Sequence, residues 1–280
     1  MFRIIISFIF LFNITVSNAE EVTYGGIGEN IDLYHTELLQ LILDHVESKE
    51  YQVNRYDIEI PHMRAFEFLA TKKDIDIVIG YATNERKRKF RAIPLPIMKG
   101  INGLRTSIIH KDNLAAFKGI KTLDEFKQFK PGLHHAWTDN KIFAANGIET
   151  VKGSSYEGLF QMLNQKRFDY YPITIFEAVR ELKKYKTINQ LDLVIDPHLL
   201  ISYPVCFYFY VEKSNVVLAQ DIVNGFEAII ANGKFDQVFD KYHGEVIAKF
   251  LKEKRTILHL NNPLLPPGVP LERKELWINY

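Results

Sequence analysis

The chain has 280 residues, 47% of them hydrophobic, and its 35 basic and 34 acidic side chains give a formal net charge of +1. This balance gives no electrostatic basis for nucleic-acid binding. The single cysteine, Cys206, excludes an intramolecular disulfide, so the fold must be held by a hydrophobic core. Cys206 lies in the β-prone run 203–210, which indicates a buried thiol and not a nucleophile.

The amino-terminal residues have the three parts of a secretory signal peptide. Residues 1–3 are short and basic, residues 4–16 are apolar, and residues 17–19 have a small-x-small pattern. We expect export to the periplasm with cleavage after Ala19, which leaves equal numbers of basic and acidic residues. A membrane anchor is the alternative, but the apolar run is shorter than the roughly 20 residues that span a bilayer.

Beyond the signal peptide, hydrophobic periodicity predicts strands that alternate with helices. In chain order we expect a strand over 22–26, a helix over 32–48, a strand over 53–60, a helix over 63–70, and strands over 76–80 and 107–110. This alternation is typical of parallel sheets covered by helices.

A second unit of the same kind begins near residue 110. Its predicted elements are a helix over 123–126, a strand over 132–136, a helix from 138 to 146, a strand over 148–151, a helix ending near 166, a strand over 168–171 and a helix ending at 185. The patterns 154–157 and 174–177 have the form of capping boxes, which predict two of these helix starts.

The last predicted elements return to the first unit. We expect a long strand over 202–211, helices over 216–233 and 234–243, and a tail whose prolines exclude a regular helix or central strand over 262–268. Trp277 or Tyr280 would pin this tail to the surface.

These patterns together predict an α/β protein with two lobes joined by two crossover strands near 104–110 and 202–211. The predicted division is a signal peptide over 1–19, a first lobe over 20–106 and 206–280, and a second lobe over 107–205. We expect a cleft between the lobes that closes by a hinge motion.

The strongest indication of a ligand site is the end of the strand over 76–80. Thr83 and Arg86 follow it on a short turn, where α/β folds place ligands. A planar guanidinium beside a hydroxyl suits a carboxylate or similar anion. The alternative is a surface arginine that pairs with Glu85.

Three aromatic residues are candidates for the walls of this cleft, because such side chains usually line small-ligand sites. They are Tyr24, Tyr81 and Trp137, each of which could equally be a packed residue. His134 and His135 are adjacent, so on a strand they would point to opposite faces and could not form a paired metal site.

The sequence resembles a known family in the run 74–80, in Thr83-x-x-Arg86 and in the Pro94-Leu-Pro segment. The pattern is that of type 2 periplasmic solute-binding proteins of family 3, the polar amino acid group. Further segments resemble parts of this family or of a less characterised proteobacterial branch of it, and they are 132–139, 158–163, 166–172, 226–242 and 273–277.

The resemblance implies roles for several residues. Arg86 would clamp a ligand α-carboxylate with help from Thr83, and Thr138 and Asp139 would stand at the helix start that contributes from the second lobe. Tyr171 is a further candidate, in a segment where the related branch has Phe-Pro-Arg. Thr174 takes the place of the carboxylate that grips the ligand ammonium. The ammonium would then meet Glu177 or Asp139, or the ligand is not an amino acid.

The function that we predict is a monomeric periplasmic binding protein for a small anionic or zwitterionic solute. Its partner would be an inner-membrane permease, for ABC-type uptake, or a sensor receptor. The alternative is an exported enzyme on the same scaffold, dehydratase-like or esterase-like, with Asp139 and Glu177 as its carboxylates. We predict no catalytic residue, metal or cofactor.

Overall fold

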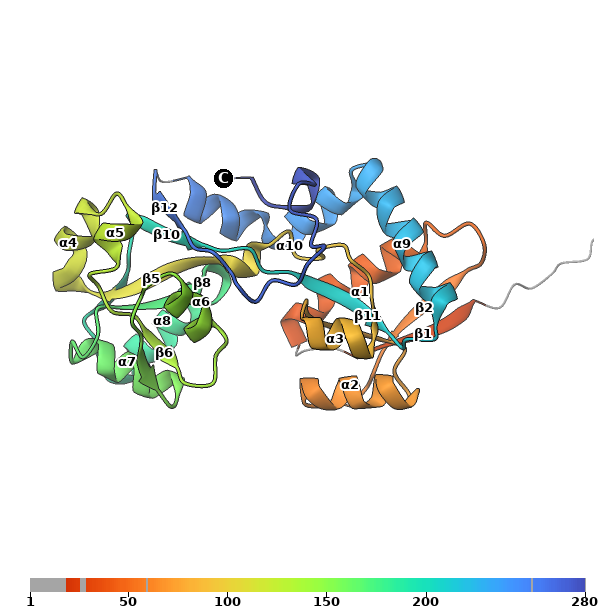
Figure 1. The fold of residues 1–280 in the computed structure, drawn as a ribbon, viewed down its shortest axis with the longest axis horizontal. Helices are drawn as coiled ribbons and strands as arrows, with labels where there is room; N and C mark the ends of the chain where they lie inside the picture. Colours follow the sequence, from red (N-terminus) through yellow and green to blue (C-terminus); the bar gives the residue numbers. More distant parts are fainter. Residues whose placement is uncertain (1–18, 26–28, 59, 253, 280) are drawn as a thin grey trace, which may run out of the picture.

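The computed structural model describes residues 19–25, 29–58, 60–252 and 254–279. It shows two lobes side by side, each built on its own β-sheet (Figure 1). The predicted signal peptide lies outside the described residues, apart from Ala19. Within the described ranges, no helix combines the length and the apolar character needed to cross a membrane.

The first lobe has a five-stranded sheet in the order β2-β1-β3-β11-β4. The strands are β1 (Glu20–Gly25), β2 (Tyr51–Arg55), β3 (Ile77–Tyr81), β4 (Arg91–Ala92) and β11 (Phe207–Val211), and the helices are α1 (Glu29–Leu43), α2 (His62–Thr71), α3 (Asn84–Lys89) and α9 (Val216–Ala231). β1 is parallel to β2 and β3, whereas β11 is antiparallel to β3 and β4. Residues 77–80 of β3 are all buried, as expected for a strand covered on both faces.

The second lobe has a sheet in the order β12-β10-β5-β8, with β9 also paired to β5. These strands are β5 (Leu104–His110), β8 (Tyr170–Thr174), β9 (Leu193–Ile195), β10 (Leu199–Ser202) and β12 (Thr256–His259), beside a small parallel pair of β6 (Gly132–His134) and β7 (Val151–Gly153). The helices are α4 (Leu114–Gly119), α5 (Leu123–Phe126), α6 (Asp139–Ala145), α7 (Tyr156–Asn164) and α8 (Ile175–Asn189). The expectation of parallel pairing is wrong for β5, which is antiparallel to β8, β9 and β10 because it enters this lobe directly as a crossover strand.

The two crossover segments touch where they pass between the lobes. The backbone N–H of Tyr203 donates to the carbonyl of Gly103 at 3.2 Å, and Ser202 pairs with Leu104. A Cβ atom at Gly103 would lie 1.8 Å from the Tyr203 carbonyl oxygen, so only glycine permits this approach. The predicted single strand over 202–211 is wrong: it is split into β10 and β11 around Pro204, which cannot donate to a ladder.

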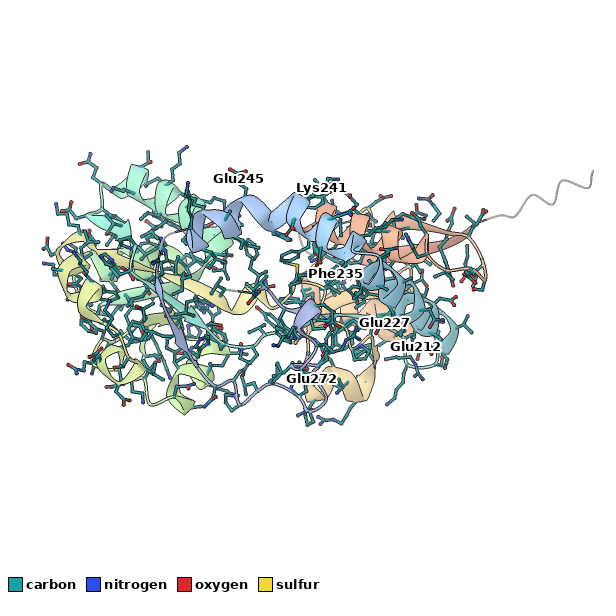
Figure 2. All side chains as sticks on the ribbon, turned by 90° about the horizontal axis from the view of Figure 1, so that it is seen from above. Glu212, Glu227, Phe235, Lys241, Glu245 and Glu272 are labelled. Carbon is teal, nitrogen blue, oxygen red and sulfur yellow. The ribbon has the colours of Figure 1, made fainter. Side chains whose placement is uncertain are left out.

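The last long helix, α10 (Lys234–Leu251), extends eight residues beyond the predicted end at 243 and runs from the first lobe to the second (Figures 1 and 2). Lys241 Nζ on this helix contacts Glu37 on α1 at 2.6 Å. Near its far end, Phe250 is buried in a hydrophobic cluster that includes residues of both lobes. The chain then forms β12 in the second sheet, within a range that the sequence assigned to the first lobe. The predicted lobe boundaries themselves stay a prediction.

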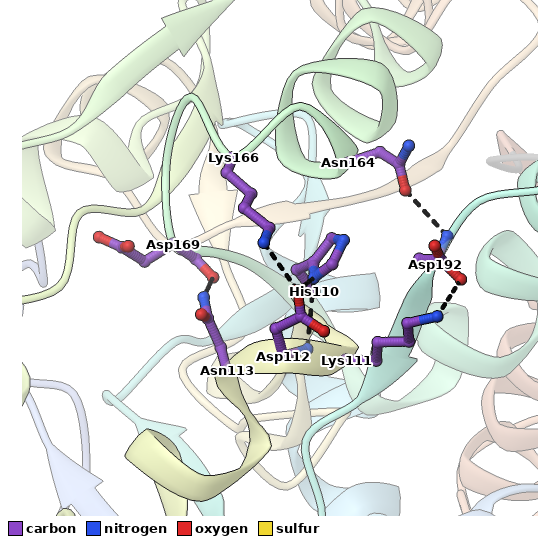
Figure 3. A network of polar contacts seen from close by, with 8 residues as sticks. All are labelled: His110, Lys111, Asp112, Asn113, Asn164, Lys166, Asp169 and Asp192. Carbon is purple, nitrogen blue, oxygen red and sulfur yellow. Dashed lines mark hydrogen bonds and ion pairs between the residues drawn. The ribbon is translucent and has the colours of Figure 1, made fainter.

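A network of exposed polar contacts fixes the outer end of β5 (Figure 3). His110 Nδ1 accepts from the backbone N–H of Asp112, whose carboxylate contacts Lys166 Nζ at 2.7 Å. Beside it, Lys111 Nζ contacts Asp192 at 2.8 Å. Solvent screens exposed ion pairs of this kind, so they contribute little to the stability of the lobe.

Neither predicted capping box forms, although Thr174 is the N-cap of α8 as predicted. Ser155, one residue later than expected, caps α7 by accepting the backbone N–H of Gly158 at 3.1 Å. Thr174 makes no such bond at the start of α8 and instead donates its hydroxyl to Glu177 Oε2 at 2.7 Å. A complete capping box is present at Thr122 and Glu125, where the sequence predicts only the helix.

Candidate functional site

Thr83 and Arg86 lie together on the turn after β3, as the sequence predicts. Thr83 is the N-cap of α3, and its Oγ1 accepts the backbone N–H of Arg86 at 3.2 Å. Arg86 Nη1 donates to the carbonyl of Tyr81 at 3.0 Å, and burial lowers the pKa of the guanidinium. The alternative role of Arg86 as a partner of Glu85 is not what the structure shows, since Glu85 pairs with Lys89 at 2.8 Å.

The guanidinium of Arg86 lies against an aromatic ring. Its Cζ is 4.7 Å from the centroid of the Phe66 ring, a cation–π distance. A Cβ at Gly80 would lie 2.8 Å from Phe66 and 3.3 Å from Arg86 Cζ, so glycine lets both groups rest on β3. Among the described residues, no carboxylate comes within ion-pair distance of Arg86. The site thus holds a half-buried guanidinium, and most of its five N–H donors remain able to bind an anion.

Tyr81, at the end of β3, lies between the charged groups of the two lobes. It exposes 42% of its surface, and its ring lies 4.0 Å from that of Phe207. Burial of its hydroxyl raises its pKa; the Arg105 guanidinium opposes this rise, and the Asp139 and Glu177 carboxylates add to it. These three charges come from the second lobe and that of Arg86, which also acts on Tyr81, comes from the first, so Tyr81 lies among charges of both lobes.

Asp139, at the start of α6, is bound within the protein. Its Oδ1 contacts Arg105 Nη2 at 2.7 Å and accepts the Tyr203 hydroxyl at 2.5 Å, while Arg105 Nε donates to that hydroxyl at 2.6 Å. The side chains of Arg105 and Asp139 are only 11% and 13% exposed. Burial lowers the pKa of Arg105, but the Asp139 carboxylate overrides this and holds it above its usual range. Asp139 thus offers little free charge to a ligand.

The other predicted second-lobe residues form an aromatic wall. Trp137 is half-buried, its ring nearly parallel to that of Tyr171 at 6.1 Å and edge-on to that of Tyr156 at 5.4 Å. Tyr171 itself is fully buried. Thr138 is exposed, and its side chain makes no capping bond to α6. Tyr156 is the first residue of α7, and no sequence pattern marks it as a site residue.

Glu177 is the acidic group next to this wall. Its carboxylate accepts the Thr174 hydroxyl and is 34% exposed, and its closest ion-pair contact is Arg180 Nη2 at 4.0 Å. Burial raises the pKa of Tyr156 to about 12, and the Glu177 carboxylate adds to the rise. The pKa of Tyr171 is raised first by burial, then by the Tyr156 phenol and then by the Glu177 carboxylate. Glu177 therefore lies close to both phenols.

Tyr24 takes the packed alternative, and the histidine pair differs from its prediction. Tyr24 is fully buried in the first-lobe core, edge-on to His35 at 6.5 Å, so the structure does not bring it to the cleft with Arg86. His134 and His135 do not point to opposite faces, because β6 ends at His134 and the turn after it stacks their rings at 4.4 Å. In the described part of the chain, no three His, Cys, Asp or Glu side chains could hold a metal ion together.

Of the cavities in the structure, one adjoins Tyr203 and another lies at the far end of the first sheet. One of about 220 Å³ is lined by Lys99, Tyr203 and Trp277, among others, beside the crossover strands. The other, of about 610 Å³, lies at the ends of β1 and β2 and includes Arg55 and Asp57. Neither cavity is lined by Arg86 or Glu177.

Comparison with protein-family models and with curated proteins finds no match. Solved structures do match. One is the probable amino-acid ABC transporter extracellular-binding protein ytmK from Bacillus subtilis, with a TM-score of 0.59, 15% identity, and coverage of 81% of this chain and 99% of that one.

Two further structures have a TM-score of 0.51. One comes from work on glutathione import in Gram-positive bacteria via GshT and the cystine ABC importer TcyBC of Streptococcus mutans, with 17% identity over 81% of this chain and 96% of that one. The other is a histidine kinase sensor domain with similarity to periplasmic binding proteins, with 14% identity over 81% and 97%. The chain therefore has the two-lobed α/β fold of the type 2 periplasmic binding proteins, as the sequence predicts.

Proposed function

We propose that the protein is exported to the periplasm and closes its two lobes on a small anionic or zwitterionic solute, for ABC-type uptake or for sensing. The observation that carries this proposal is Arg86, a half-buried guanidinium oriented by Tyr81 and Phe66 and lacking a carboxylate partner among the described residues. A guanidinium has five N–H donors in a planar fork, which matches a carboxylate. The solute's anionic group would bind there.

The second lobe would supply the other half of the site. Asp139 is already neutralised by Arg105, so Glu177 is the carboxylate left to meet a cationic group of the solute. Trp137, whose ring is edge-on to that of Tyr156, would offer an apolar face to the solute. A solute with both charges, such as an amino acid, would thus bridge Arg86 and Glu177, and Tyr81 would lie between them.

The names of the structural neighbours support this class of function, since they include an amino-acid transporter binding protein and a sensor domain. The enzyme alternative has less support. It needs Asp139 and Glu177 as a pair of working carboxylates, and Asp139 is bound by Arg105 and Tyr203. We propose a binding protein that is not an enzyme.

Thermal unfolding with a panel of amino acids and of carboxylates without an ammonium group tests the proposal. A solute at 100 times its Kd should stabilise the protein by about 2.7 kcal/mol. Arg86→Ala should weaken binding about 10- to 150-fold, the value of a charged hydrogen bond. Arg88→Ala, an exposed arginine on the same helix, is the matched control and should change nothing.

Glu177→Gln separates the two solute classes. It should weaken the binding of zwitterions and leave ammonium-free carboxylates unchanged or improved. If no solute in the panel stabilises the protein, or if Arg86→Ala behaves like Arg88→Ala, the proposed site is wrong.

A further inference from the structure

The residues after β12 form a fourth connection between the lobes, besides the two crossover segments and α10. β12 pairs in parallel with β10 in the second sheet, and the Leu260 N–H continues the ladder by donating to the Ser202 carbonyl at 2.8 Å. From there, the tail passes back to the first lobe, as its dark blue ribbon shows (Figure 1). We call residues 260–279 the strap.

The strap is fastened to the second lobe at the end of α6. Asn261 and Asn146 exchange two hydrogen bonds: the Asn261 N–H donates to Asn146 Oδ1 at 2.9 Å, and Asn146 Nδ2 donates to the Asn261 carbonyl at 2.8 Å. Asn262 Nδ2 donates to the carbonyl of Pro204 at 2.9 Å, next to the crossover. α6 begins at Asp139, two residues after Trp137 of the aromatic wall. This end of the strap therefore holds the helix that follows the wall.

The strap reaches the first lobe at α3. Lys87 Nζ donates to the carbonyl of Pro267 at 2.8 Å, and Lys87 directly follows Arg86. Leu265 and Val269 pack into the apolar cluster that contains Phe66, the ring beneath the Arg86 guanidinium. The strap therefore contacts both the helix that carries Arg86 and the apolar cluster beneath its guanidinium.

The far end is fixed by several strong contacts. Arg273 binds Glu227 on α9 through two hydrogen bonds of 2.6 and 2.9 Å; Figure 2 shows Glu227 on this helix. Trp277 lies against Gly100 and donates Nε1–H to the Pro270 carbonyl at 2.9 Å, and the Ile278 N–H donates to the Lys99 carbonyl at 2.9 Å. The end of the strap cannot slip without breaking these contacts.

The segment that crosses between the lobes is short and stiff. It runs from Asn262 to Pro267, five residue steps that span at most about 17 Å when fully extended. Residues 263, 266 and 267 are prolines, which restrict the backbone further. We propose that the strap sets the maximum separation of α6 and α3, and thereby the opening of the two lobes.

A longer strap tests this proposal. Six Gly/Ser residues inserted between Pro263 and Leu264 keep both sets of anchors and add a reach of up to about 20 Å. Spin labels at Lys73→Cys and Lys152→Cys, exposed positions in the first and second lobe, report the distance between the lobes without any solute. The same insertion between Ser48 and Lys49, in a surface turn of the first lobe, is the control.

The strap insertion should shift the distance distribution to longer values by several ångströms and broaden it, whereas the control insertion should leave it unchanged. Lys87→Met, which removes one anchor and no chain length, should give a smaller shift of the same sign and serves if the insertion does not fold. A distance distribution identical to that of the parent protein in the folded variant would overturn the proposal. Because no solute is present, this result is independent of the proposed binding function.

Discussion

Replacing Asp139 by asparagine separates a structural role of this residue from a role in binding. The substitution keeps the size of the side chain but removes the charge that faces Arg105, and both side chains are nearly buried. Removing one partner of a buried ion pair leaves the other charge uncompensated, which costs about 3–5 kcal/mol. The hydrogen bond from the Tyr203 hydroxyl is weakened as well, because an amide oxygen is a weaker acceptor than a carboxylate oxygen. This lowers the stability further.

The expected loss of about 3 kcal/mol in the free energy of unfolding corresponds to a fall in Tm of about 6–12 °C for a chain of this size. Urea denaturation followed by circular dichroism measures it, with the m-value as a check on two-state unfolding. Asp124→Asn is the matched control, since Asp124 pairs with Lys127 on the surface at 91% exposure and should cost less than about 0.5 kcal/mol.

A loss below about 1 kcal/mol for Asp139→Asn would refute this reasoning, because the pair would then contribute no more than an exposed one. The binding interpretation predicts the reverse pattern. If Asp139 served a solute cation, the substitution would weaken binding and leave the stability of the solute-free protein nearly unchanged.

Three further results are expected. Gly103→Ala should destabilise the protein by more than about 3 kcal/mol in thermal unfolding, because its Cβ would overlap the Tyr203 carbonyl oxygen; Gly119→Ala, with nothing within 4 Å of its Cβ, should not. Burial lowers the pKa of His35 to about 3. The free energy of unfolding therefore falls as the pH drops below 6.5, because the unfolded state binds a proton at His35 before the folded state does. Between pH 7 and pH 5 this costs about 2 kcal/mol, and His35→Phe should abolish that part of the loss. Burial raises the pKa of Cys206 to about 12, so a thiol reagent at pH 8 should modify it only on unfolding, and rapid labelling of the native protein would contradict its burial.

The sequence carried enough local information to predict the turn at Arg86. A β-branched run, a glycine and the Thr83-x-x-Arg86 spacing all act within about ten residues, and the structure places Thr83 and Arg86 together as expected. The same is true of the helix over 123–126, whose observed bounds agree with the prediction.

Contacts between distant residues could not be predicted in this way. Asp139 looked like a ligand residue because its two partners are distant in the chain. Arg105 lies 34 residues before it and Tyr203 lies 64 residues after it. No local pattern shows that a buried guanidinium will neutralise a helix-start acid. Periodicity likewise could not reveal that β12 joins the second sheet, because that choice depends on which edge is open.

The order of strands in the two sheets has a consequence for how the chain folds as it is synthesised. β11 lies between β3 and β4, so the long buried edge of β3 has no partner until residue 211 has emerged. The second sheet likewise waits for residues 256–259 to cover β10. Unpaired hydrophobic strand edges are where growing chains aggregate. The nascent chain therefore has at least one unpaired strand edge from the emergence of β3 until residue 259 has emerged.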